Sequence, residues 1–246
     1  MSPKYVFYAL IVVFCWAANF TAVKIGLQHF PPFLLLVLRF ALVAALLLPF
    51  YWRRTLSVKF LLAMASVTGT AHFALVFGGL AYGIDIATGI LTVQLGVPFS
   101  CVLSAVFFKD KLGAWRSFGM VVSFMGVIMI AGTPNVADHF GPFLMTMAGA
   151  FCWAAGNVIM KREGEVPVME LLAWMSLFAV PQLLALSLLV ERDHWELIQT
   201  ITPSAAYSIG FSAVFSTLVA YGLWYYLLKR CEVSRVAPFN LLIPFV

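Results

Sequence analysis

The chain has 246 residues, of which 63% are hydrophobic and only 10% are charged, and its mean hydropathy is +1.00. So few polar side chains cannot cover a water-facing surface of this size, which excludes a soluble globular domain and predicts an all-α membrane protein. The net charge of +5 does not indicate a nucleic-acid partner, because the chain has neither a basic face nor an arginine-rich arm. We therefore expect the lipid bilayer to be its main partner.

Eight apolar stretches are each long enough to cross the bilayer, which takes about 20 helical residues. In chain order they are Tyr5–Ile25, Pro32–Phe50, Phe60–Ala81, Ile86–Phe108, Trp115–Ala131, Phe140–Met160, Val168–Val190 and Ser204–Leu228. A ninth begins near Val236 and reaches Val246 without a polar exit. Because a half-crossed helix leaves backbone groups unsatisfied in lipid, we expect this sequence to be a fragment of a longer protein.

The basic residues predict the orientation of these spans. If the N-terminus is cytoplasmic, 12 of the 15 Lys and Arg residues fall on the inner side of the membrane. They are Lys4, Arg53, Arg54, Lys59, Lys109, Lys111, Arg116, Lys161, Arg162, Lys229, Arg230 and Arg235. This bias predicts a multi-pass protein of the plasma or inner membrane with a cytoplasmic N-terminus.

One short motif is written twice. FCWAA occupies Phe14–Ala18 and Phe151–Ala155, and the same offset of 137 residues separates Lys24 from Lys161. The two copies lie in the first and sixth predicted spans, five spans apart, and this odd separation makes the two helices cross the membrane in opposite directions. The repeat is therefore predicted to be inverted. We interpret the two lysines as side chains that reach the membrane interface from apolar helices.

A second match supports the repeat. LGVPF in the fourth span aligns with LLIPF, just before Val246 in the ninth, which pairs Pro98 with Pro244 and Gln94 with Asn240. We expect an inverted repeat of five transmembrane helices, ten in the full protein and about eight and a half here. Inverted repeats are the architecture of alternating-access transporters, whose substrate site lies near the midplane between the halves.

The predicted halves are residues 1–131 and 140–246, the second of them truncated within the ninth helix. Close helix contacts within the halves are predicted at two rows of small residues. One row is Ala148, Cys152 and Gly156 in the sixth span, and the other is Gly119 with Ser123 in the fifth.

Several segments resemble a known family: FCWAANFTAVKIG, the LRF around Arg39, AFCWAAGNVIMKR, and AYGLWYYLLKRCEVSRVAPFNLLIPFV. They look like the EamA family of the drug/metabolite transporter superfamily, and most like its amino-acid-metabolite exporters of the O-acetylserine/cysteine type. The resemblance implies ten helices, cytoplasmic termini and efflux of a small-molecule substrate from a central cavity. One departure is Asp110, which stands where the family usually has Glu, so the role of that acid is open.

The repeated pair of helices supplies the first candidate substrate-binding residues. Trp16 is followed within a turn by Asn19, and Trp153 by Asn157. Amide and indole groups inside hydrocarbon need partners and commonly face a cavity. The alternative is that the asparagines only bridge helices and that the tryptophans are packing residues.

The paired prolines, Pro98 and Pro244, predict helix kinks. A proline inside a helix frees the carbonyl four residues earlier, here those of Gln94 and Asn240. Each kink would then present a bare carbonyl beside a polar side chain, and such groups often line a substrate path. The alternative is a pair of ordinary packing kinks satisfied by neighbouring helices.

Two further candidates are ionisable. Arg39 lies inside the second span and needs a partner there, either a substrate carboxylate or groups of the protein itself. His72 is the ionisable group of the third span and is read either as a proton carrier or as a satisfied structural histidine. Because every Asp and Glu lies in a loop or at a helix end, we expect facilitated diffusion or exchange.

The sequence contains no pattern typical of catalysis or metal binding. It has no HExxH, no nucleophile with a base and no paired aspartates in the spans, so we predict no catalytic residues. The four cysteines form no CxxC pair, which predicts no metal, and we expect no cofactor. An intramembrane enzyme and a non-transporting scaffold or receptor remain the alternatives to a transporter, and the sequence does not specify the oligomeric state.

Overall fold

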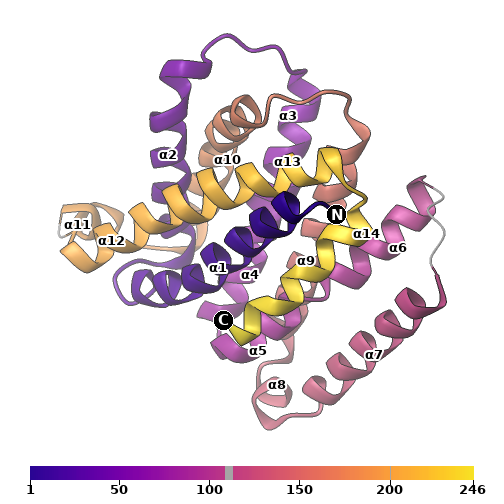
Figure 1. Cartoon of the computed structure of the whole chain (residues 1–246). Helices are drawn as coiled ribbons and strands as arrows, with labels where there is room; N and C mark the ends of the chain where they lie inside the picture. The colour runs from indigo at the N-terminus through magenta and orange to yellow at the C-terminus, as the bar shows by residue number, and fades with distance from the viewer. Residues whose placement is uncertain (109–112, 200) are drawn as a thin grey trace.

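The structure, a computed structural model, describes residues 1–108, 113–199 and 201–246 (Figure 1). Within those ranges the regular elements are helices. The first half of the chain contains α1 (Pro3–Gly26), α2 (Pro32–Tyr51), α3 (Val58–Met64), η1 (Ala65–His72), α4 (Phe73–Ala81), α5 (Ile86–Val93), α6 (Gly96–Phe108), α7 (Ala114–Ala131) and α8 (Pro134–Asp138). The second half contains α9 (Phe140–Arg162), α10 (Val168–Val190), α11 (His194–Gln199), α12 (Pro203–Phe211), η2 (Ser212–Tyr221), α13 (Gly222–Arg230), α14 (Val233–Val236) and η3 (Ala237–Phe245).

Among the described residues, seven helical runs are long and apolar enough to cross a bilayer. They are Pro3–Gly26, Pro32–Tyr51, Val58–Ala81, Ile86–Phe108, Phe140–Arg162, Val168–Val190 and Pro203–Arg230, and α7 adds a shorter apolar stretch, Ser117–Ala131. The all-α membrane fold is therefore confirmed, and each of the eight predicted full spans is helical. The ninth predicted span is α14 followed by η3, a 3-10 helix that contains Pro244.

The third and eighth spans each contain a π-helical segment, η1 and η2. Both segments are rich in small and hydroxyl residues, and the Thr217 hydroxyl donates to the Ser212 carbonyl across the wide turn of η2 at 2.9 Å. A π segment inserts an extra residue into the helix and redirects the side chains and carbonyls around it. Sequence reasoning predicted continuous α-helices here and missed both segments.

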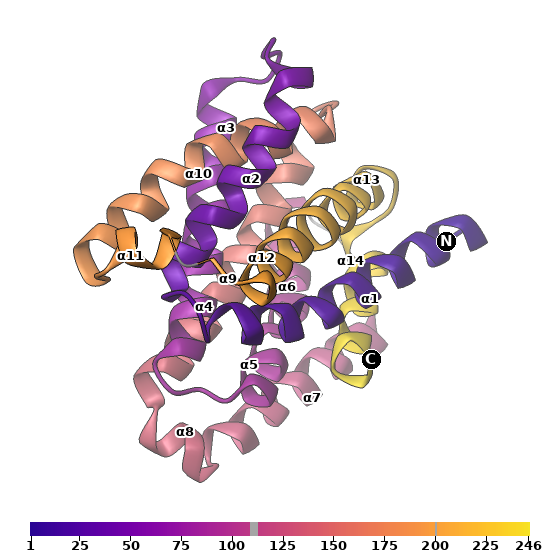
Figure 2. The same ribbon diagram turned by 90° about the vertical axis from the view of Figure 1, so that its left-hand side faces the viewer.

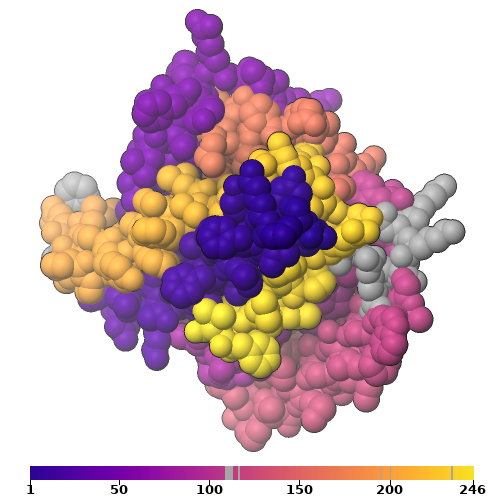
Figure 3. Space-filling view, in the orientation of Figure 1, coloured from indigo at the N-terminus to yellow at the C-terminus, as the bar shows by residue number. Residues whose placement is uncertain are grey.

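The two halves exchange helices in their packing. α1 of the first half packs on the eighth span, and α9 of the second half packs on the third. α1 runs antiparallel to its partner, because Tyr8 contacts Tyr226 near one end while the Ser208 hydroxyl donates to the Ala22 carbonyl near the other. Figure 3 shows α1 lying across the C-terminal segments. This reciprocal arrangement is the one expected of an internal repeat in which neither half is complete alone.

Glycines bring α9 close to the third span. A Cβ at Gly149 would lie 3.1 Å from the carbonyl oxygen of His72, and one at Gly156 would lie 2.0 Å from Oγ1 of Thr68. The contact predicted at Gly156 is thus confirmed, but Ala148 is exposed. The glycines in close contact, Gly149 and Gly156, are seven residues apart, whereas the predicted row of small residues has a spacing of four.

α2 and α10 pack along their length. Two glutamates join them at both ends, Glu170 in the first turn of α10 and Glu191 at its C-cap. Glu191 accepts hydrogen bonds from two backbone N–H groups in the first turn of α2, at 2.6 and 2.9 Å. Glu170 accepts from the backbone N–H groups of Thr55 and Leu56, just beyond the end of α2. Each carboxylate satisfies donors that a helix end or loop would otherwise leave unpaired, so the pair fixes the register of these two helices.

α7 runs along the outside of the bundle (Figures 1 and 2). Its large apolar side chains face outward, with Trp115 88% and Met129 77% exposed. The close contact predicted at Gly119 is not found among the described residues, since a Cβ there would meet no atom within 4 Å. This exposed surface is suited to lipid chains.

We expect Gly149→Ala to lower the stability of the folded protein by about 1–3 kcal/mol, because the added methyl group meets backbone atoms of the third span that cannot rotate away. Thermal unfolding in lipid nanodiscs measures the effect. The matched control is Gly141→Ala in the same helix, where the new Cβ would meet no atom within 4 Å and should leave stability unchanged or slightly raised. Equal melting temperatures for the two variants would contradict the packing described above.

Candidate functional site

A pocket lined by residues of both halves holds about 690 Å³ of space free of protein atoms, part of it open to the surroundings. We call it the central pocket. Its lining from the first half is Trp16, Asn19, Phe20, Val23, His72, Phe73, Val76, Phe77, Leu80, Val93, Gln94 and Val97. Its lining from the second half is Trp153, Ser216, Tyr221, Asn240 and Ile243. Concave, mostly apolar sites with a few polar groups are typical of small-molecule binding.

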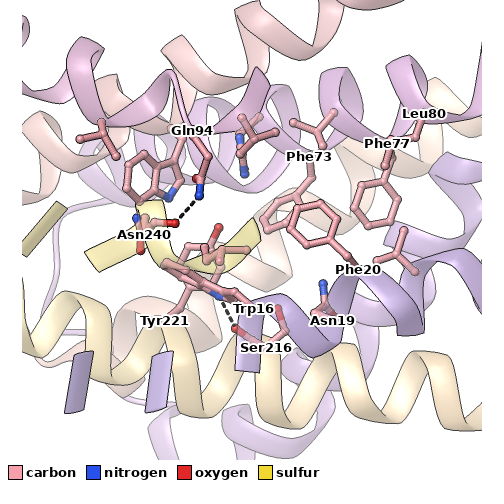
Figure 4. Close-up of a pocket in the computed structure, with 17 residues that line it drawn as sticks. Trp16, Asn19, Phe20, Phe73, Phe77, Leu80, Gln94, Ser216, Tyr221 and Asn240 are labelled. Atoms are coloured by element: carbon pink, nitrogen blue, oxygen red, sulfur yellow. Dashed lines mark hydrogen bonds between the residues drawn. The ribbon is translucent and has the colours of Figure 1, made fainter. Parts of the chain in front are cut away.

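Six of the eight predicted substrate-binding residues line this pocket, and Figure 4 shows four of them labelled. The six are Trp16, Asn19, His72, Gln94, Trp153 and Asn240. Arg39 and Asn157 do not line it. The sequence did not identify Tyr221 or the phenylalanines of the lining as pocket residues, because a buried aromatic residue in a hydrophobic helix has the same sequence pattern as ordinary packing.

The repeated tryptophans meet at one end of the pocket. Trp16 and Trp153 lie edge to face with ring centroids 6.3 Å apart, and both contact Trp224, at 5.3 and 5.1 Å. Tyr221 adds a fourth ring, 5.0 Å from Trp16. We call these four rings the aromatic floor. Trp16, Trp153 and Tyr221 line the pocket on the side nearer the N-terminus of α1, and the rest of the lining extends along the C-terminal half of α1 and along α4.

Trp16 and Asn19 are both attached to η2. The Trp16 indole donates to the backbone carbonyl of Ser216 at 3.2 Å, and the Ser212 hydroxyl donates to Oδ1 of Asn19 at 2.7 Å. The Asn19 nitrogen points toward the pocket in Figure 4, and it has no hydrogen-bond partner among the described residues. Asn19 thus uses its acceptor to bind the protein and presents a donor to the cavity.

Asn157 has a different position, although it is the counterpart of Asn19 in the repeat. Its Oδ1 accepts from the Trp224 indole at 3.0 Å, and its Nδ2 donates to the Ser100 hydroxyl at 3.3 Å. The side chain is 98% buried, and both ends of the amide are occupied by protein groups. The structure therefore assigns Asn157 to bridging α6, α9 and α13, which is the alternative that the sequence left open.

His72 lines the pocket at the end of η1. Its Nδ1 lies 2.9 Å from the carbonyl oxygen of Gly149. A carbonyl can only accept, so Nδ1 carries the hydrogen in this contact and Nε2 of the neutral ring is left as an acceptor. The same bond joins the third span to α9, so His72 has a structural role in addition to its position on the wall.

Gln94 and Asn240, the matched residues of the two halves, contact each other directly. Nε2 of Gln94 donates to the backbone carbonyl of Asn240, as the dashed line in Figure 4 shows. That carbonyl precedes Pro244 by four residues and is available to a side chain, as predicted. The side-chain Oδ1 of Asn240 is buried without a hydrogen-bond partner.

The corresponding prediction for Pro98 is wrong in one respect. The carbonyl of Gln94 is not bare, because the N–H of Val97 donates to it at 3.0 Å. The fourth span breaks at Gln94 and Leu95, and Pro98 lies in the first turn of the new helix, α6. A tight turn at the break satisfies the carbonyl that a single bent helix would have left free.

Arg39 is 99% buried behind the pocket wall. Its Nε donates to the Thr217 hydroxyl at 2.9 Å and its Nη2 to the Ser216 hydroxyl at 3.1 Å. The guanidinium also lies 4.4 Å from the ring centroid of Phe73. Protein groups therefore supply the partners that a buried arginine requires, although Nη1 has none.

The two symmetric lysines do not share a role. Lys161 donates from Nζ to the carbonyls of Leu228 and Cys231, both at 3.0 Å, and so caps the C-terminal end of α13. Lys24 is exposed at the end of α1. The position of both lysines at the membrane interface stays a prediction, to which the structure adds these hydrogen bonds of Lys161. Asp110 lies outside the described residues.

The lining of the central pocket is polar in places but contains no Lys, Arg, Asp or Glu. Within the described part of the chain, no three His, Cys, Asp or Glu side chains come together as metal ligands would. The pocket offers a donor from Asn19, an acceptor from His72 and aromatic faces, and the buried Oδ1 of Asn240 has no partner among the described residues. This set can bind a small polar molecule with an apolar portion.

Asn157→Ala should destabilise the fold by about 1–3 kcal/mol, because it leaves a buried indole N–H and a buried hydroxyl without partners. Asn19→Ala, the same substitution at the counterpart position, removes one protein hydrogen bond and should cost less. Thermal unfolding of both variants in lipid nanodiscs tests the difference. A larger loss for Asn19→Ala would contradict the assignment of Asn157 to helix bridging.

Comparison with known proteins adds to this geometry. The EamA-like transporter family matches residues 3–132 and 140–246. A probable amino-acid metabolite efflux pump of Salmonella typhimurium strain LT2 is 34% identical over 100% of this chain and 85% of its own length. A protein of the same description from Escherichia coli strain K12 is 32% identical, with the same coverage. A solved crystal structure at 17% identity superposes with a TM-score of 0.75 over 99% of this chain and 86% of its own, which shows a shared fold.

Proposed function

Because this chain belongs to the EamA-like transporter family, we propose that it exports small amino-acid-derived metabolites through the central pocket. The observation that carries the proposal is the position of the pocket, which lies between the halves of an internal repeat and takes lining residues from both. The names of the efflux pumps described above support the substrate class. No catalytic step is part of this function.

The mechanism we propose is alternating access. The aromatic floor separates the central pocket from a second hollow at the opposite end of α1, which is lined by residues that include Tyr8, Tyr226 and Arg230. Each hollow would be the access route from one side of the membrane. Exchanged helix packing between inverted halves supports a motion in which one hollow closes as the other opens.

The basic residues support a plasma-membrane location with a cytoplasmic N-terminus. In that orientation the central pocket opens outward and the aromatic floor lies on its cytoplasmic side. The state described here would be the one that releases cargo during export.

Within the pocket, Asn19 would donate to the substrate and His72 and Asn240 would accept from it. Trp16 and Trp153 would contact its apolar portion. Gln94 would act at the joint between the fourth and ninth spans, because its hydrogen bond to Asn240 links the two halves beside the cavity. We propose facilitated diffusion or exchange as the transport mode, since no carboxylate lines the cavity.

Protein reconstituted in lipid vesicles should transport labelled O-acetylserine, cysteine or another neutral amino acid from a broad panel. Gln94→Ala should lower the initial rate several-fold, because it removes the hydrogen bond between the halves and a polar group of the pocket. The matched control is Gln28→Ala, at an exposed residue, which should transport like the wild type. Vesicles that show no more uptake than empty ones across the whole panel would refute the substrate assignment.

The same assay tests the transport mode when a pH gradient is imposed and then removed. Facilitated diffusion or exchange predicts the same initial rate in both conditions. A rate that depends on the gradient in the wild type and loses that dependence in His72→Gln would instead identify proton coupling through the histidine.

A further inference from the structure

Arg39 is the one buried guanidinium beside the central pocket in the described part of the chain, and the function proposed above does not use it. Resting on that function, we propose that Arg39 sets the charge selectivity of the pocket. Its uncompensated positive charge favours substrates that carry a carboxylate, zwitterionic or anionic, and disfavours organic cations. Arg39 would act through space and through its neighbours, as a specificity-determining residue that does not contact the substrate.

Among the residues that the structure describes, the charge of Arg39 has no counter-ion. Its two hydrogen-bond acceptors, the hydroxyls of Ser216 and Thr217, are neutral. Nη1 is buried without a partner, and no carboxylate of the described residues lies within ion-pair distance. A guanidinium in the membrane interior is normally paired, so this one leaves a net positive potential in its surroundings.

The positive potential of Arg39 extends into the pocket. Phe73 and Ser216 both line the cavity and both contact Arg39, on two sides of the guanidinium. A ligand on the pocket side of Phe73 would be separated from the guanidinium only by the Phe73 ring. The guanidinium is 4.4 Å from the ring centroid, so an atom in contact with the opposite face would be roughly 8 Å away.

No lining residue of the pocket cancels the potential of Arg39. The wall has no acidic side chain. The two glutamates that contact α2 are bonded at its ends, Glu170 to Thr55 and Leu56 beyond the last turn and Glu191 to backbone N–H groups of the first turn. The guanidinium of Arg39 is therefore the main fixed charge close to a ligand in the cavity.

The size of the effect follows from the separation. At roughly 8 Å and an effective dielectric constant of about 20, a unit negative charge gains about 30-fold in affinity, the equivalent of about 2 kcal/mol. A cation loses affinity by a comparable factor. A zwitterion can place its carboxylate toward Phe73 and its ammonium against the tryptophan faces, which attract cations, so this pocket suits amino acids better than amines.

The experiment compares each of several neutral amino acids with its own primary amide, which has the same side chain and ammonium group but no carboxylate. Both compounds compete against a labelled amino acid for uptake by the reconstituted full-length protein. In the wild type we expect the amide to need on the order of 30-fold higher concentration. Equal potency of acid and amide in the wild type would overturn the inference without any variant.

Two variants then test whether Arg39 is the source. Arg39→Gln keeps donors for Ser216 and Thr217 but removes the charge, and should reduce the ratio between amide and acid to within about threefold. Arg39→Lys keeps the charge and should preserve most of the ratio. A purely structural role would weaken the acid and the amide equally, so an unchanged ratio in Arg39→Gln would refute the inference.

The outcomes are separable from those of the function itself. If no amino acid or amide is transported or competes, the proposed substrate class is wrong and the selectivity falls with it. If amino acids are transported but their amides compete equally well, the exporter function stands and the role of Arg39 is refuted.

Discussion

The antiparallel contact between α1 and the eighth span is the interaction on which the rest of the structure depends. In hydrocarbon, a polar group that finds no partner costs several kcal/mol, so helices must satisfy one another. η2 does this for α1 through a carbonyl that accepts from Trp16 and a hydroxyl that donates to Asn19. The same segment bonds Arg39 of α2. One π-helical stretch thus fixes two first-half helices and forms part of the pocket wall.

The duplicated motif explains why the site lies where it does. FCWAA in α1 and α9 brings Trp16 and Trp153 together at the junction of the halves, and exchanged packing places each motif helix on a π-containing span of the other half. The repeat is not a copy in chemical detail, however. Asn19 presents a donor to the cavity, whereas Asn157 has both ends bonded to protein. The repeat supplies matching helices on the two sides of the pocket, and residues that differ in role between the halves make those two sides chemically different.

The sequence was sufficient for those features that depend on composition and period, and insufficient for those that depend on local geometry. Hydropathy predicted the helices, and the FCWAA offset predicted the repeat, because both are long-range patterns. The π segments, the turn that satisfies the Gln94 carbonyl and the cap that Lys161 forms on α13 depend on which neighbour is within hydrogen-bond distance. No single-sequence pattern carries that information. Likewise, Gly149 was missed because the register of a tight helix face is decided by its partner.

The contacts that join the halves around the pocket floor are aromatic packing and neutral hydrogen bonds. In the floor, Trp16 meets Trp153 and Tyr221 edge to face, and a neutral side-chain hydrogen bond joins Gln94 to Asn240. By contrast, Glu170 and Glu191 tie α2 to α10 at both ends with charged hydrogen bonds. A rocking motion would therefore cost least at the floor and at the joint between the fourth and ninth spans, with the α2 and α10 pair as its fixed axis. Because Arg39 belongs to that fixed pair, its charge would stay beside the cavity in both states while the walls move.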